Sequence, residues 1–358
     1  MTYPKTWRDD ILLNTYKKPP QERTTRPSMS GPASERLELA KRRLVNVLHD
    51  NVVAAMRTLE QKISDAGPGG MRIDPHALLN ARKQLEGEGI ITRRIEASTP
   101  WFHLATADPR DVAARLSVLR PLHLAVQQTN FAKRLGQTLE IATYRALLSQ
   151  SALTTFGSYL DLDEHDDSTL YRKEEPPSTI SGRTCGSRKL DFIVSAGGAM
   201  AGIEIKNVRE WMYPNRDEVR DLLFKATVLD VMPVFIARRI PFVTFRLLNA
   251  CGVIIHQTYN QLFPEADASL AAQVRDKTLL GYHDVRLSNA PDARLLKFAQ
   301  ANLPGLITKL RPRFDEFKDL LTAFGDKSMP YAEFAARVRR RTQGTDEDSD
   351  WQDAGDQE

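Results

Sequence analysis

The sequence predicts an α/β fold, with a mixed sheet built in the order αβββαβ and a helical domain before it. Three observations predict this fold. Apolar residues recur at helical spacing over residues 136–150. Short apolar or alternating runs, typical of strands, follow at 156–160, 190–194 and 201–206. Helical and strand patterns then alternate up to residue 264, which favours parallel pairing because parallel strands need a crossover connection.

The composition is that of an ordinary globular protein. Hydrophobic residues make up 41% and charged residues 27% of the 358 residues, which excludes collagen, coiled-coil rods and wholly disordered chains. Two cysteines, Cys185 and Cys251, are too few for a disulfide scaffold or a cysteine-based zinc site. The sequence has no secretory-signal pattern and no apolar run near the ~18 residues of a membrane helix. We therefore expect a cytoplasmic protein that has no membrane partner.

Charge is unevenly distributed along the chain. The formal net charge is +4, but seven acidic residues and no basic residue follow Arg341. Residues 1–341 therefore carry a charge of +11, from 50 basic against 39 acidic residues. A basic body suggests an anionic partner. The tail over 343–358 is expected to be disordered, and it either competes for the basic surface or is simply solvated.

The N-terminal part divides into an arm and a folded unit. Prolines and glycines break any helix over residues 1–34, so we expect an irregular arm there. Residues 35–107 show a long helical pattern, then a second helix that begins at Asp74 with proline in its first position. Two short strands, at 90–95 and 101–104, complete the unit. A helical connection, 108–135, is expected to follow.

Two helices followed by a basic hairpin resemble the winged-helix family of DNA-binding domains. In that family a helix enters the major groove and the hairpin touches the DNA backbone. The resemblance implies that Arg82, Lys83, Arg93 and Arg94 contact phosphates or bases. One short helix of the family pattern is hard to find in this sequence. The alternative is a helical packing domain whose arginines are merely exposed.

A charged pair stands on the third predicted core strand. Ile203 and Ile205 face one side of that strand, while Glu204 and Lys206 face the other. Unpaired buried charge is costly, and a divalent cation would account for the pair. Mg²⁺ prefers oxygen ligands, and Asp191 on the neighbouring strand can lie beside Glu204, with the Ile205 carbonyl completing the set. Lys206 would then orient a metal-bound water, help it to lose a proton, or balance phosphate charge. A structural ion pair at a sheet edge is the alternative.

This arrangement resembles the PD-(D/E)XK nuclease superfamily, which includes many restriction endonucleases and Holliday-junction resolvases. The matching residues are Leu190-Asp191 and Glu204-Ile205-Lys206. Leu190 stands where proline is common, and a long polar stretch, 161–187, replaces a short turn. The resemblance covers about residues 136–264 and implies a restriction-endonuclease-like sheet, with Glu140 on the first core helix helping to hold the metal. It implies Mg²⁺ as cofactor, with Mn²⁺ as a substitute, and a homodimer.

Other charged residues surround the expected core. Lys225, on the next helix, and Arg238-Arg239, after a buried strand, either bind phosphate or are simply exposed. Acidic residues gathered over 161–167 form either a second metal site or a solvated loop. The region 265–342 is expected to be mainly helical, and its basic end either touches DNA or completes a helix terminus.

Together these patterns predict a metal-dependent endonuclease acting on DNA, most naturally duplex DNA, in restriction and defence or in DNA repair. Two alternatives stay open. A DNA-binding or assembly protein on an inactive nuclease fold would bind DNA without cutting it. A winged-helix regulator would change its DNA affinity with a small molecule. The recognition sequence, and the need for a partner such as a methyltransferase, are left open by the sequence.

Overall fold

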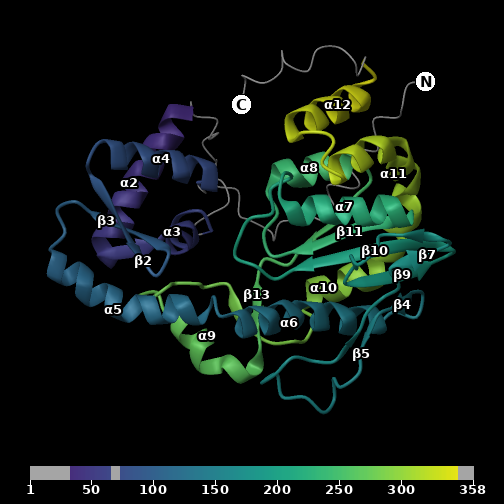
Figure 1. The fold of residues 1–358 in the computed structure, drawn as a ribbon, viewed down its shortest axis with the longest axis horizontal. Coiled ribbons are helices and arrows are strands. Elements are labelled where there is room, and N and C mark those ends of the chain that lie inside the picture. The colour runs from purple at the N-terminus through teal and green to yellow at the C-terminus, as the bar shows by residue number, and fades with distance from the viewer. Residues whose placement is uncertain (1–32, 66–72, 346–358) are drawn as a thin grey trace, which may run out of the picture.

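The computed structural model describes residues 33–65 and 73–345 of the chain. An N-terminal domain and a larger α/β domain are joined by helix α5 (Pro109–Ala125), which leads directly into α6 (Thr129–Leu148) (Figure 1). The arm expected over 1–34 lies outside the described residues, except for its last two, which already belong to a helix. The acidic tail beyond residue 345 also lies outside them.

The N-terminal domain follows the order helix, strand, helix, helix, strand, strand. Its elements are α2 (Ala33–Asn51), β1 (Val53–Ala55), α3 (Met56–Ile63), α4 (Pro75–Gly87), β2 (Ile91–Glu96) and β3 (Thr99–Leu104). The strands form an antiparallel sheet in the order β1-β3-β2. β3 therefore lies between the hairpin partner β2 and a strand that is distant in sequence.

The prediction of one continuous long first helix for this domain is wrong, because a short strand divides it. The chain leaves α2 at Val52, which has a φ of 66°, and Val53 then pairs with His103 of β3. β1 is buried along its whole length, so its burial against β3 outweighs the helical spacing of its apolar residues. The start of α4 is as predicted, because Asp74 accepts hydrogen bonds from the backbone N–H groups of His76 and Ala77.

The α/β domain is built on a mixed sheet with the strand order β12-β11-β10-β9-β4. Its strands are β4 (Thr154–Phe156), β9 (Phe192–Ala196), β10 (Ala199–Lys206), β11 (Met232–Ala237) and β12 (Ile254–Gln257). β4, β9 and β10 pair antiparallel, whereas β10, β11 and β12 pair parallel. The predicted mixed α/β class is confirmed. Gly197 and Gly198, both with positive φ, make the tight turn between β9 and β10.

Helices cover both faces of this sheet (Figure 1). The crossover helices α7 (Asp217–Leu229) and α8 (Phe242–Ala250) lie on one face, and α6 lies on the other. α6 begins before the start at residue 136 that the sequence predicts. The long helix α11 (Leu303–Gly325) packs along α7, and the pair contributes Leu222, Leu223, Phe317 and Leu321 to the core.

The first core strand is shorter than predicted, because the chain turns at Gly157, whose φ is 91°. Residues after this turn leave the main sheet and form two small hairpins before β9. They are β5 (Ser158–Tyr159) with β6 (Lys173–Glu174), and β7 (Thr179–Ile180) with β8 (Arg183–Thr184). We call residues 157–189 the excursion. The excursion lies alongside the main sheet rather than extending it.

The C-terminal region is mainly helical, as predicted, but it also contributes a strand. Its elements are η2 (Glu265–Asp267), α9 (Ala268–Arg275), β14 (Val285–Leu287), α10 (Ala293–Lys297), η3 (Phe298–Asn302), α11 and α12 (Tyr331–Gln343). β14 pairs in parallel with β13 (Gln261–Phe263). In the described ranges 33–65 and 73–345, no helix combines the length and apolar character needed to cross a membrane.

The two domains share an apolar core beneath α5. Val53 and Trp101 of the N-terminal domain pack there with Leu116 of α5, Phe131 of α6 and Tyr282 of the C-terminal region. The indole ring of Trp101 is fully buried in this cluster. Burial of aromatic surface is strongly stabilising, so this cluster holds the two domains together.

Candidate active site

Asp191 and Glu204 lie side by side because two adjacent strands bring them together. The backbone N–H of Asp191, just before β9, donates to the Ile203 carbonyl at 2.9 Å. Its side-chain Oδ2 accepts from the backbone N–H of Ile205 at 2.6 Å. Asp191 is therefore attached to β10 on both sides of Glu204. Ile205, predicted to offer its carbonyl to a metal, also supplies the N–H that fixes this carboxylate.

Two lysines neutralise Glu204, which is only 5% exposed. Lys206 Nζ lies 2.5 Å from one carboxylate oxygen, and Lys225 Nζ of α7 lies 2.5 Å from the other. Lys225 also donates to the Lys189 carbonyl at 2.8 Å and is 2% exposed. The prediction of Lys225 as a phosphate ligand is therefore corrected: its ammonium is buried against Glu204 and faces no solvent.

Glu140 lies on α6 and is connected to the same site through Lys173, a residue that the sequence analysis did not single out. Its Oε2 accepts from Tyr159 OH at 2.8 Å and from Lys173 Nζ at 2.7 Å. Lys173 Nζ also lies 3.6 Å from Asp191 Oδ1. Both Tyr159 and Lys173 belong to the excursion. In the sequence, the unusual length of the polar stretch 161–187 was the one signal that this segment could contribute residues to the site.

Burial and mutual charge set the electrostatics of this site. Burial raises the pKa of Asp191, and the nearby Glu140 carboxylate raises it further. Burial likewise raises the pKa of Glu204, with a contribution from Asp191. Burial acts to lower the pKa of Lys206, but the attraction of Glu204 and Asp191 outweighs it and the net shift is upward. Lys206 is therefore an ammonium at neutral pH, able to donate protons in hydrogen bonds and unable to accept one.

The donor chemistry suits a hard divalent cation. Glu140, Asp191 and Glu204 offer carboxylate oxygens, the ligands that Mg²⁺ prefers. Lysine ammonium groups, however, stand between these carboxylates. Among the residues that the structure describes, no group of three His, Cys, Asp or Glu side chains forms a ready-made cage for a metal ion. A cation would therefore enter this site by displacing ammonium contacts.

Arg238 and Arg239 lie at the junction of the two domains rather than at the candidate site. Arg238 is 1% exposed, and its guanidinium lies 2.9 Å from Asp65 and 2.7 Å from Asp284. Arg239 Nε lies 3.1 Å from Asp65. The prediction that these arginines bind phosphate is corrected, because buried carboxylates of both domains already occupy them.

The basic residues that the sequence predicts as DNA contacts in the N-terminal domain differ in their exposure to solvent and in their ion pairing. Arg82 pairs with Glu86 at 2.7 Å and stacks over the Phe102 ring. Lys83 on α4 and Arg93 on β2 are exposed to solvent. Arg94 is also exposed, but it lies 2.6 Å from Glu96. Lys83 and Arg93 are thus the predicted DNA contacts that are most accessible to a ligand.

The acidic residues over 161–167 brace the excursion. Asp161 accepts from the backbone N–H of Arg172 at 3.0 Å. Asp167 is buried and accepts from Asn289 Nδ2 and from the Glu265 backbone N–H, each at 2.9 Å. These bonds account for Asp161 and Asp167, while Asp163, Glu164 and Asp166 are exposed to solvent.

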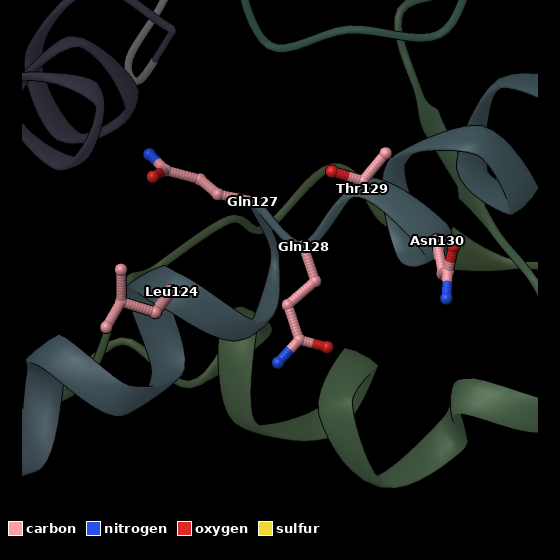
Figure 2. A pocket seen from close by; sticks show the side chains of 5 residues that line it. All are labelled: Leu124, Gln127, Gln128, Thr129 and Asn130. Atoms are coloured by element: carbon pink, nitrogen blue, oxygen red, sulfur yellow. The ribbon is translucent and has the colours of Figure 1, made fainter.

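A cavity of about 560 Å³ lies where α5 passes into α6 (Figure 2). It is lined by Leu124, Gln127, Gln128, Thr129 and Asn130. None of the candidate carboxylates contributes to this lining, so the cavity is separate from the site.

We compared the chain with models of known families, with curated proteins and with solved structures, and none of them matches it.

Proposed function

We propose that this protein is a metal-dependent DNA endonuclease. The observation that carries the proposal is the fixed arrangement of Asp191 beside Glu204-x-Lys206, on adjacent antiparallel strands of a mixed sheet. The Asp191–Ile205 hydrogen bond of 2.6 Å holds the two halves of the motif in register. The element order α6-β4-β9-β10-α7-β11, with Glu140 facing the motif from α6, supports the resemblance to the PD-(D/E)XK superfamily.

In this proposal the residues of the site divide the work of hydrolysis. Asp191 and Glu204, with the Ile205 carbonyl, hold Mg²⁺ or Mn²⁺. A divalent cation held there would supply Lewis-acid chemistry, lowering the pKa of an attacking water and neutralising charge on the phosphodiester. Lys206 orients that water through its ammonium, which carries its proton at neutral pH. Glu140 supports the site from α6, through the neighbours that it shares with Asp191.

The N-terminal domain supplies duplex DNA binding in this proposal. Its order of helices and strands, with β1 beside β3, supports the winged-helix resemblance, and α3 stands where the sequence pattern lacked a short helix. Lys83 on α4 and Arg93 on the β2–β3 hairpin would meet the backbone. A homodimer would cut both strands, and a restriction, defence or repair setting with or without a methyltransferase fits this activity.

The direct test is cleavage of mixed plasmid and phage DNA with Mg²⁺ and with EDTA. We expect cutting with Mg²⁺ only, and its loss in Glu204→Gln, which removes the charge but keeps the shape. Lys206→Ala should abolish cutting and leave DNA affinity within a few fold, because Lys206 acts on the water. Equal loss of cutting and binding in Lys206→Ala would contradict that role, and metal-independent cutting would contradict the metal site.

A second candidate is a DNA-binding or assembly protein on an inactive nuclease fold. The observation that favours it is that lysine ammonium groups already contact Glu140 and both oxygens of Glu204. It predicts DNA binding that is indifferent to Mg²⁺, with no cutting under any metal condition.

A further inference from the structure

Each carboxylate of the candidate site already has an ammonium group beside it. Its carboxylates are Glu140, Asp191 and Glu204, and its ammonium groups are Lys173, Lys206 and Lys225. Two partly exposed carboxylates lie at the edge of this set, Asp221 at 2.8 Å from Lys225 and Glu175 at 3.9 Å from Lys173. A divalent cation that enters between the buried carboxylates meets ammonium groups already in place, which is unfavourable unless a positive group moves away or an anion arrives.

Lys173 differs from the other two lysines in its position. Lys206 and Lys225 both pair with Glu204, whereas Lys173 lies between Glu140 and Asp191, 2.7 Å and 3.6 Å from their oxygens. The distance to Asp191 is longer than a hydrogen bond. Lys173 therefore donates a hydrogen bond to Glu140 and attracts Asp191 by its positive charge. Its ammonium thus occupies the place where a cation shared by these carboxylates would lie.

Lys173 also belongs to a part of the chain outside the main sheet. It lies on β6, paired with Tyr159 of β5, and its side chain is 11% exposed. The neighbouring Arg172 holds the backbone there, because its N–H donates to Asp161 Oδ1 at 3.0 Å and its carbonyl accepts from the Leu160 N–H at 2.9 Å. The backbone beside Lys173 is therefore anchored, and a rotation of its long, flexible side chain is enough to vacate the site.

We propose that Lys173 is a positioning residue that competes with the metal ion for the space between Glu140 and Asp191. The lysine holds the two carboxylates together in the metal-free protein and swings out when a divalent cation enters. This inference rests on the proposed function, because it uses the same metal site. The displaced ammonium is then free to meet a phosphate of the DNA, so metal and DNA each favour binding of the other.

The test is the affinity of the metal-free full chain for Mn²⁺ alone, without DNA, measured by titration calorimetry. We expect Lys173→Gln to bind Mn²⁺ at least tenfold more tightly than the native protein, because a like charge has been removed from the site. Lys173→Arg keeps the charge and should bind within about threefold of native. Lys318→Gln is the matched control for net charge, since Lys318 pairs with Asp230 rather than with the carboxylates of the site.

The outcomes separate this inference from the proposed function. Mn²⁺ binding that is unchanged or weaker in Lys173→Gln would overturn the competition and leave the metal site intact. No binding to any of the proteins would overturn the metal site and, with it, the proposed nuclease. An equal gain in Lys318→Gln would trace the effect to net charge and overturn the role of Lys173. Folding of each variant is checked by circular dichroism, and Lys173→Met, with the same expectation, replaces a glutamine variant that does not fold.

Discussion

Gly202 on β10 shows how tightly the motif is packed at the scale of single residues. A Cβ built on Gly202 would lie 2.4 Å from Leu190 Cδ1 and 2.9 Å from Val231 Cγ2. Leu190 directly precedes Asp191, in the position where the related motif commonly has proline. Its side chain fills the space over Gly202, so apolar packing at this point helps to hold Asp191 opposite β10.

We expect Gly202→Ala to lower the free energy of unfolding by about 1–3 kcal/mol, because overpacking forces neighbouring side chains to shift. Gly136→Ala is the matched control, since nothing lies within 4 Å of a Cβ at that position on α6. There alanine should raise stability by about 1 kcal/mol through its higher helix propensity. Denaturant unfolding measures both changes. Stability that is unchanged in Gly202→Ala would mean that Leu190 can move aside.

At the scale of elements, the β2–β3 hairpin and α4 present the accessible basic groups of the N-terminal domain. Thr92 to Ile95 are exposed along β2, and Ala97 and Ser98 make the turn with positive φ. β2 is thus an edge strand whose side chains mostly face solvent, while Trp101 and Phe102 of the central strand β3 are buried. A basic, solvent-facing hairpin next to a helix is the geometry that a duplex backbone can contact.

We expect Lys83→Ala and Arg93→Ala to weaken DNA binding, and each to reduce the slope of log affinity against log salt by about 1, because each removes one phosphate contact. Lys297→Ala, an exposed lysine on α10 of the other domain, is the control and should leave the slope unchanged. Fluorescence anisotropy at several salt concentrations provides the measurement. Slopes that match the native protein in both variants would move the DNA surface away from this hairpin.

At the scale of the whole molecule, a buried carboxylate connects the two domains. Asp65, at the end of α3, contacts Arg238 and Arg239 and accepts from the indole N–H of Trp211 at 3.2 Å. Asp284 of the C-terminal region holds the other side of Arg238. Together with the shared apolar core beneath α5, these contacts fasten the two domains to each other. In the proposed function, such a junction would give a bound duplex a fixed orientation relative to Asp191 and Glu204.

We expect Asp65→Asn to lower the free energy of unfolding by about 3 kcal/mol, because the buried guanidinium groups of Arg238 and Arg239 both lose the negative charge that they share. The matched control is Asp217→Asn, in which an exposed aspartate paired with Lys327 loses its charge. A surface pair contributes little, so this control should leave the unfolding midpoint nearly unchanged. Urea unfolding of both variants makes the comparison, and equal losses in the two would contradict a structural role for the buried network.

Several features follow from the sequence alone because they depend on near neighbours. The alternation of Ile203 and Ile205 with Glu204 and Lys206 predicted which residues share a face, since strand periodicity is local. The cap at Asp74 followed from its own side chain. The order of core helices and strands, and so the mixed α/β class, came from runs of apolar residues whose length and spacing carry the information.

Only the tertiary structure decided what lies opposite each charged side chain. The sequence predicted that Lys225, on a helix, and Arg238, after a buried strand, bind phosphate or are simply exposed. In the structure Glu204 holds Lys225 in the interior, and Asp65 and Asp284 hold Arg238 there. The position of Lys173, between Glu140 and Asp191, depends on the path of a long polar excursion that has no periodic pattern. Contacts between residues far apart in sequence depend on the packing of the whole chain, so local sequence patterns do not predict them.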